Sequence, residues 1–168
     1  MDVRGKPRVP RIAHPLYLPY PEPAVRGGGG RRLRRMLSRL ISLFRRRRIP
    51  EFVLPEEGDL LRTPSGLGVH VLDPGSGHKP GATDTVTVRY AGWLIEGKLF
   101  DASYPGTATF PLNRVVRGWT EGLQHVAAGG SVILVIPPEL AYGSRGAPPR
   151  IGPGATLVFR VELVSIDG

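Results

Sequence analysis

The sequence predicts an α+β domain in which an antiparallel sheet curls over one short helix. Apolar residues recur at every second position in several segments after residue 66, most plainly in Thr85–Tyr90, as they do in half-buried strands. Turns containing glycine or proline separate these segments and favour hairpins. One segment, residues 118–126, has helical spacing instead. One short helix among several strands is typical of the α+β class.

Each expected element can be placed along the chain. In Thr85–Tyr90, Val86, Val88 and Tyr90 share one face, while threonine and arginine take the other. In the helix, Trp119, Leu123 and Val126 have helical spacing, and Gly129-Gly130 ends the segment. The other expected elements are a turn at 95–98, a short strand through Phe100, a short strand near 107–110, and strands at 131–136 and 156–166.

The charges divide the chain into two chemically different parts. The chain has 23 basic and 14 acidic side chains. Residues 1–50 hold 14 of the basic and 2 of the acidic ones, which leaves 9 basic and 12 acidic side chains for residues 51–168. Residues 1–30 are rich in proline, glycine and arginine, which predicts a disordered tail. In residues 31–48, apolar side chains follow the i, i+3, i+4 rule between arginines, which predicts a basic amphipathic helix. We expect a linker at 49–65 and a globular domain at 66–168.

The basic helix has two candidate partners. Its apolar stripe consists of Leu33, Met36, Leu37, Leu40, Ile41 and Phe44. An anionic membrane would accept both the stripe and the arginines, so we expect it to be the better partner. Nucleic acid would attract the same charges but would leave the stripe exposed. A different interpretation is that translation starts at Met36, so that the residues before it are not part of the natural protein.

No segment predicts membrane insertion or export. The most apolar part of the basic segment, residues 36–44, contains Arg39 and is far shorter than the roughly 20 residues that a bilayer span requires. It runs into four arginines rather than into a small-residue cleavage site, unlike a secretory signal. We therefore expect a cytoplasmic protein, with a position at the membrane surface and in the periplasm left open.

The usual catalytic devices are missing from the sequence. The chain has no cysteine, which excludes a thiol nucleophile, a disulfide and a thiolate metal site. Its four histidines are scattered and belong to no metal-binding or phosphate-binding motif. The spacing of Asp101 and Glu121 does not require an acid–base pair. We expect neither a metal ion nor a cofactor.

A set of aromatic and branched residues flanked by glycines remains to be explained. Its blocks are Tyr90-Ala91-Gly92, Phe100-Asp101-Ala102-Ser103, Val115-Val116-Arg117-Gly118-Trp119, Ala141-Tyr142-Gly143, and Ile151 with Phe159. In order and spacing, these blocks resemble the FKBP family of peptidyl-prolyl cis-trans isomerases, with a single FKBP domain of the bacterial kind. The resemblance runs from about Ser65 to Asp167, and its most specific stretch is Phe110–Gln124.

The resemblance implies a curved half-barrel sheet around the helix that Trp119 opens, with a proline pocket between them. It implies catalytic roles for Tyr90, Phe100, Asp101, Trp119 and Tyr142, and substrate binding by Val115, Val116, Ile151, Phe159 and Phe110. Trp119 would form the floor, and Asp101 and Tyr142 a polar rim. The N–H groups of Val116 and Ile151 and the Tyr142 hydroxyl would donate hydrogen bonds to ligand carbonyls. Asp101 would act on the substrate carbonyl or position Tyr142, and not as a general base.

The residue chemistry suits such a role. Isomerising an Xaa–Pro bond breaks no covalent bond and needs only a lower barrier to amide rotation, about 18–20 kcal/mol without a catalyst. The twisted amide is less dipolar than the planar one, so a rigid apolar pocket favours it. The expected partners are therefore polypeptides containing Xaa–Pro bonds. A non-catalytic module that binds proline-containing partners, tethered by the basic tail, is the alternative.

The sequence departs from the resemblance in the loops around the pocket. Arg150 stands in the loop 148–153, where apolar residues are frequent in the family, and we expect it to change substrate preference. Residues 107–109 lack an aromatic side chain that some relatives carry, which makes binding of a macrolide ligand an open question. The loop 142–151 is too short for an inserted chaperone domain, and no terminal dimerisation domain is expected. The chain is therefore expected to be a monomer.

Overall fold

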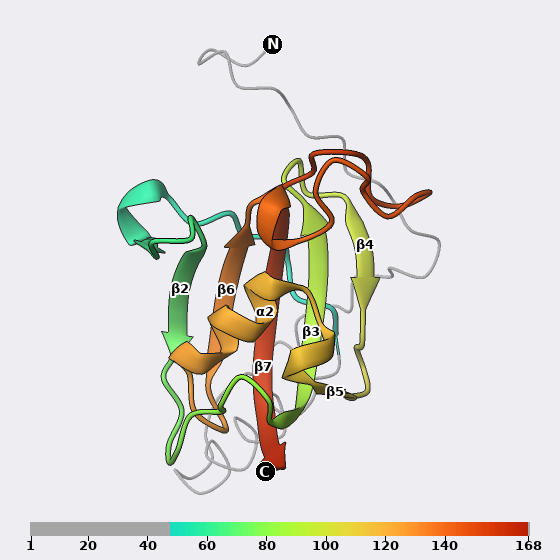
Figure 1. Ribbon diagram of the computed structural model, residues 1–168. Coiled ribbons are helices and arrows are strands. Elements are labelled where there is room, and N and C mark those ends of the chain that lie inside the picture. The colour runs from blue at the N-terminus through green and yellow to red at the C-terminus, as the bar shows by residue number, and fades with distance from the viewer. Residues whose placement is uncertain (1–47, 168) are drawn as a thin grey trace, which may run out of the picture. The chain divides into compact units, whose positions relative to one another are not determined.

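Seven antiparallel strands form one sheet in the part of the chain that the structure, a computed structural model, describes, residues 48–167 (Figure 1). The strands are β1 (Leu61–Arg62), β2 (Gly68–Asp73), β3 (Thr85–Leu94), β4 (Leu99–Ala102), β5 (Ala108–Pro111), β6 (Ser131–Ile136) and β7 (Leu157–Asp167). Their order is β1-β2-β6-β7-β3-β4, and β5 pairs with the first half of β3. The predicted tail 1–30, and the predicted helix 31–48 except for Arg48, lie outside the described residues.

A short helix, α2 (Arg117–Gly122), crosses one face of the sheet in front of β6 and β7 (Figure 1). Four short 3-10 turns accompany it: η1 (Glu57–Asp59), η2 (Leu112–Arg114), η3 (Leu123–His125) and η4 (Pro138–Leu140). The α+β prediction, a curved antiparallel sheet around one short helix, is confirmed. The helix expected at 118–126 is α2 followed by η3, because the chain tightens into the 3-10 form after Gly122, as helix ends often do.

The core lies between α2 and the face of the sheet that it covers. Along β3, buried residues alternate with half-buried ones from Thr85 to Tyr90, as the sequence predicts. The alternation then stops, because Ala91, Gly92 and Trp93 are all buried. Both faces of β3 are therefore covered near its end. The fully buried side chains of the core include Val86, Val88, Leu123, Val126, Leu134, Ile136, Leu157 and Leu163.

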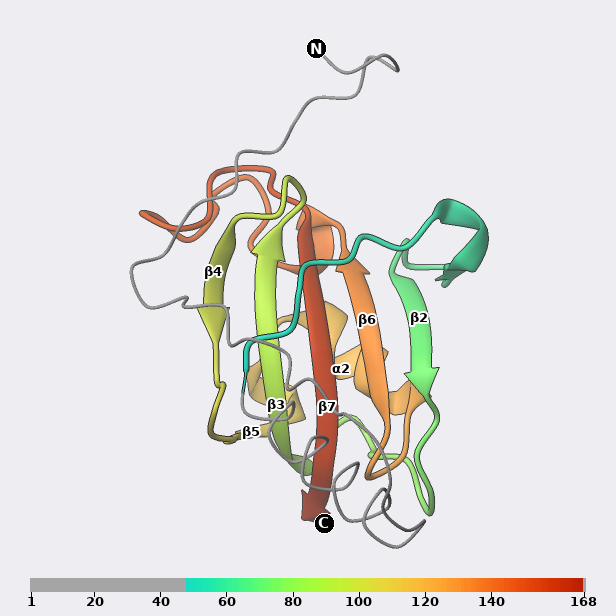
Figure 2. The ribbon, with the colours of Figure 1, turned by 180° about the vertical axis from the view of Figure 1, so that it is seen from behind.

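The chain before β1 covers the back of β3. Phe52 packs against Trp93 with ring centroids 5.8 Å apart, and the segment that carries it crosses the back of the sheet (Figure 2). Leu61–Arg62 then pairs with Gly68–Val69 as the first strand. The structured part of the chain thus includes residues on the N-terminal side of position 66, where the sequence predicts the domain to begin.

Two glycines bring α2 close to β6. A Cβ atom on Gly122 would lie 2.5 Å from Leu134 Cδ2, and one on Gly118 would overlap the side chain of Ile136. Real Cβ atoms do not approach other atoms so closely, so only glycine fits at these positions while the helix keeps its place. This close approach positions Trp119, the residue after Gly118, against the sheet.

We predict that Gly122→Ala destabilises the domain by about 1–3 kcal/mol, the usual range for overpacking a core. The sign of the change in the free energy of unfolding is informative, because replacing glycine by alanine at a solvent-exposed helix position stabilises by about 1 kcal/mol. Urea denaturation measures the change. Gly58→Ala is the control, since a Cβ there would meet nothing within 4 Å. A more stable Gly122→Ala variant would contradict the close packing of α2 on β6.

Candidate active site

Trp119 is the centre of a cluster of aromatic rings contributed by separate elements. It lies in the first turn of α2 and is 4% exposed. Its ring meets those of Tyr90, Phe159 and Phe110 edge to face, with centroid distances of 5.1, 5.3 and 5.9 Å. These three rings come from β3, β7 and β5. Edge-to-face pairs at such distances add roughly 0.5–1.5 kcal/mol each beyond burial, so the cluster is a rigid apolar surface.

Phe100 joins the cluster through a bulge in β4. Gly92 pairs with Asp101 and the next residue, Trp93, pairs with Leu99, which leaves Phe100 as the extra residue. Bulges re-aim side chains in this way. The Phe100 ring meets Phe159 at 5.4 Å. A Cβ on Gly92 would lie 2.5 Å from Phe159 and 2.8 Å from Phe100, so the two rings share the space that a side chain would fill.

Asp101 is held at the edge of this aromatic cluster by two hydrogen bonds. The Tyr90 hydroxyl donates to Oδ2 at 2.6 Å, and the Ala102 N–H donates to Oδ1 at 3.0 Å. Burial raises the pKa of the Tyr90 phenol well above its ordinary value, and the hydrogen bond to the Asp101 carboxylate raises it further. Tyr90 therefore stays protonated and keeps donating at physiological pH. The resemblance implies that Asp101 acts on the substrate carbonyl or positions Tyr142, whereas its hydrogen-bond partners among the described residues are Tyr90 and Ala102.

The remaining predicted residues surround the cluster. Val115, Val116 and Phe110 are partly buried and pack against the core, and Ile151 is 5% exposed. The N–H of Ile151, which the resemblance predicts to donate to a ligand carbonyl, donates in this structure to the Ala147 carbonyl at 3.1 Å, and its role toward a ligand stays a prediction. The N–H of Val116 has no such partner among residues 48–167. Tyr142 is 43% exposed, and its place at the rim stays a prediction.

The indole Nε1–H of Trp119 is buried and has no hydrogen-bond partner among the described residues. A buried donor without a partner costs roughly 1–3 kcal/mol. Such groups are rare enough that each one in a native structure calls for an explanation, and a functional role is one of the recognised ones. The residue with this unpaired donor is also the centre of the aromatic cluster, so both observations point to Trp119 as part of the functional site.

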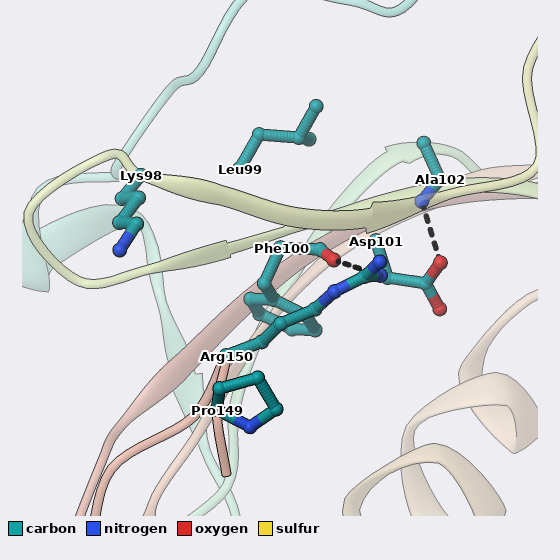
Figure 3. Close-up of a pocket in the computed structure, with 7 residues that line it drawn as sticks. All are labelled: Lys98, Leu99, Phe100, Asp101, Ala102, Pro149 and Arg150. Carbon is teal, nitrogen blue, oxygen red and sulfur yellow. Dashed lines mark hydrogen bonds between the residues drawn. The ribbon is translucent and has the colours of Figure 1, made fainter. Parts of the chain in front are cut away.

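A hollow lies next to the aromatic cluster, and Phe100 belongs to both. It has a volume of about 430 Å³ and is lined by Lys98, Leu99, Phe100, Asp101, Ala102, Pro149 and Arg150 (Figure 3). The Arg150 Nη1–H donates to the Phe100 carbonyl at 3.1 Å. Sequence reasoning singled out the block Phe100–Ser103 and the loop 148–153 but did not predict that they form a hollow with Lys98 and Leu99, because only the folded loop brings Pro149 to β4.

The described residues hold no group that suits a metal ion. No set of three or more His, Asp or Glu side chains in residues 48–167 lies close enough together to bind one. No helix in the same residues is long and apolar enough to cross a membrane. The chemistry of the site therefore rests on an apolar aromatic surface, one oriented carboxylate and a few hydrogen-bond donors.

Comparison with known proteins gives a family for this arrangement. Residues 76–164 match the model of the FKBP-type peptidyl-prolyl cis-trans isomerase family, which is more than half of the chain. The chain belongs to this family. The family match covers five of the seven strands in part or whole, α2 and all the residues of the aromatic cluster.

Individual FKBP relatives agree with the assignment. The chain is 50% identical over 104 residues to the FKBP-type peptidyl-prolyl cis-trans isomerase FkpA of Escherichia coli, covering 61% of this chain and 38% of the relative. It is 46% identical over 105 residues to the outer membrane protein MIP of Legionella longbeachae, covering 61% and 45%. The chain thus spans less than half the length of these curated relatives.

Solved structures show the same fold. The crystal structure of Escherichia coli FkpA superposes with a TM-score of 0.64 at 46% identity, covering 67% of this chain and 53% of that one. A peptidyl-prolyl cis-trans isomerase from Pseudomonas syringae gives a TM-score of 0.62 at 32% identity, covering 84% and 100%. The predicted cytoplasmic location gains no support from these comparisons, since one relative is named an outer membrane protein.

We predict that the free energy of unfolding falls as the pH rises above about 10, the ordinary pKa of a tyrosine. Burial raises the pKa of Tyr90 and of Tyr104, whose hydroxyl donates to Glu162 at 3.1 Å. The folded chain then keeps protons that the unfolded chain releases, so alkali favours unfolding. Urea denaturation at pH 9 and pH 11 measures the loss. Tyr90→Phe should make the loss smaller, and an unchanged loss would show that the Tyr90 pKa is ordinary.

Proposed function

We propose that this domain accelerates the cis–trans isomerisation of Xaa–Pro bonds in polypeptides, with the proline ring held against Trp119. The observation that supports this most strongly is the cluster of Trp119, Tyr90, Phe159 and Phe100 beside an oriented carboxylate. A proline side chain is apolar and rigid, which matches such a surface. The family to which the chain belongs is named for this reaction.

The mechanism needs no acid–base group. In the planar amide the nitrogen lone pair is conjugated with the carbonyl, and rotation removes this conjugation and lowers the dipole. An apolar pocket therefore stabilises the twisted amide relative to the planar one. Every 1.4 kcal/mol of this preference gives about a tenfold faster reaction. Ring packing, the exclusion of water and a few hydrogen bonds can together supply several such tenfold increases in rate.

Three polar groups would orient the substrate. The Val116 N–H, which has no partner among the described residues, would donate to the carbonyl of a bound peptide. The exposed hydroxyl of Tyr142 would do the same from the rim. The Asp101 carboxylate is fixed by Tyr90 and Ala102 and would bias the position of the rotating carbonyl through its charge. It would not take a proton, because the reaction transfers none.

A binding module without turnover is the second candidate, and it is not favoured. It would need the same pocket, so geometry does not separate the two candidates. Two relatives in which the matching segment occurs, FkpA of Escherichia coli and Mip of Coxiella burnetii, are named peptidyl-prolyl cis-trans isomerases. The family match therefore favours catalysis over simple binding.

Several finer predictions rest on the sequence alone. Binding of macrolides and the monomeric state have no support beyond the resemblance. Binding of an anionic membrane or of nucleic acid by residues 31–48 concerns a segment outside the described residues. Co-sedimentation of the chain with anionic vesicles, compared with neutral ones, would decide the membrane partner.

We predict that Phe100→Ala lowers kcat/KM on a short Xaa–Pro peptide by at least about tenfold, because the ring contributes apolar surface to the twisted amide. Trp119→Leu should have a similar effect, and Asp101→Asn a smaller one of about threefold. A proline-isomerisation assay measures all three. Val164→Ala, at an exposed position of β7, is the control and should keep the activity of the unchanged chain.

Folding must be verified by circular dichroism and by the urea midpoint of each variant. Full activity in folded Phe100→Ala and Trp119→Leu would show that the pocket lies elsewhere. A folded, unchanged chain that does not accelerate any peptide above the spontaneous rate would overturn the enzymatic function and leave the binding module.

A further inference from the structure

The hollow beside Phe100 adjoins the aromatic cluster. Phe100 lines the hollow and also packs on Phe159, so it belongs to both the hollow and the aromatic cluster. The hollow runs along β4, which is the last strand of the sheet in the described residues. Its other wall is the loop that carries Pro149 and Arg150 (Figure 3). With a volume of about 430 Å³ it is within the size range of ligand pockets.

Two cations line this hollow without a carboxylate partner. Neither Lys98 nor Arg150 takes part in an ion pair with another described residue. Arg150 is fixed instead by its hydrogen bond to the Phe100 carbonyl. That bond uses one of five guanidinium N–H donors, so the others remain available. Figure 3 shows Lys98 and Arg150 on the same side of β4.

The single carboxylate of the hollow is committed elsewhere. Asp101 accepts the Tyr90 hydroxyl on one oxygen and the Ala102 N–H on the other. It therefore faces the aromatic cluster as well as the hollow, and it lies more than 4 Å from the charged nitrogens of Arg150. The lining carries two positive charges against one negative charge, and its walls are otherwise the apolar side chains of Leu99, Phe100 and Pro149.

We propose that this hollow is a specificity subsite that favours an acidic residue within two positions of the proline in the substrate. The proposal rests on the proposed isomerase function. Arg150 is the specificity-determining residue, because it lines the hollow and is held there by the carbonyl of Phe100, whose ring belongs to the aromatic cluster. Lys98 adds charge from the turn before β4.

The effect has a limited size and a defined salt dependence. Both cations are exposed, and exposed ion pairs contribute little, so the total preference for an acidic peptide should be only about two- to fivefold. Arg150, which is held in place by the Phe100 carbonyl, should supply most of it. Such a preference weakens as salt shortens the range of the interaction. An apolar preference would not weaken in this way. Salt therefore separates the proposed charge selection from simple packing against Leu99 or Pro149.

The test compares peptides that differ in one residue near the proline. Glutamate and glutamine are placed in turn directly before the proline, one residue earlier and one residue later. The ratio of kcat/KM for the glutamate and glutamine peptides is measured at low and high salt. We expect a ratio of about three or more at one position at low salt, and a ratio near one at high salt.

Two variants of the chain identify the residue responsible. Arg150→Gln should bring the ratio close to one, and Arg150→Glu should invert it. Arg145→Gln is the matched control, since it removes the same charge from an exposed position of the same loop that does not line the hollow. It should leave the ratio as it is. An effect of Arg145→Gln equal to that of Arg150→Gln would overturn the subsite in favour of a general effect of net charge.

The outcomes separate this proposal from the proposed function. Equal acceleration of all peptides would overturn the subsite and leave the isomerase intact. If no peptide is accelerated, the subsite is tested by measuring the equilibrium binding of the same glutamate and glutamine peptides. A preference of the unchanged chain for glutamate that Arg150→Gln removes would then support the subsite on a binding module. Equal binding of the two peptides would overturn it.

Discussion

Two phenyl rings that meet over a glycine determine the geometry of this site. The rings of Phe100 and Phe159 fill the space next to Gly92 that any other residue would occupy. Phe159 in turn packs on Trp119, and Trp119 is pressed toward the sheet because Gly118 and Gly122 let α2 approach β6. The positions without side chains thus decide where the aromatic ones lie. A rigid apolar surface follows from this packing, and the proposed catalysis depends on its rigidity.

The polar part of the site is built onto this aromatic surface. The Tyr90 ring belongs to the cluster, while its hydroxyl fixes the Asp101 carboxylate at the edge. Because the pKa of Tyr90 is raised, its hydroxyl stays protonated to higher pH than that of an ordinary tyrosine. The bulge that places Phe100 in the cluster also brings the next residues of β4 to the hollow under Arg150. The proline pocket and the proposed subsite therefore share one local distortion of the sheet.

The sequence predicts the class of fold and the members of the aromatic cluster, but not their connections. Alternation in Thr85–Tyr90 and helical spacing around Trp119 are local signals, and they hold in the structure. The family resemblance added Phe100, Asp101 and Phe159, which lie together as expected. The bulge at Phe100, the Tyr90–Asp101 bond and the internal use of the Ile151 N–H were not predicted. Each of these depends on strand register or loop closure, which are set by contacts between distant residues.

The central claim is that a proline enters the aromatic pocket and that its amide twists there. NMR exchange spectroscopy of an Xaa–Pro peptide, recorded together with the indole N–H signals of the protein, tests it most directly. The chain has two tryptophans, and Trp93 lies on the back of the sheet against Phe52, so its signal is an internal reference. Without a catalyst, the cis and trans forms of the peptide interconvert in roughly tens to hundreds of seconds. We predict that the protein makes this interconversion far faster, and that the peptide shifts the indole signal of Trp119 but not that of Trp93. Fast exchange with an unmoved Trp119, or a shifted Trp119 without faster exchange, would contradict the account.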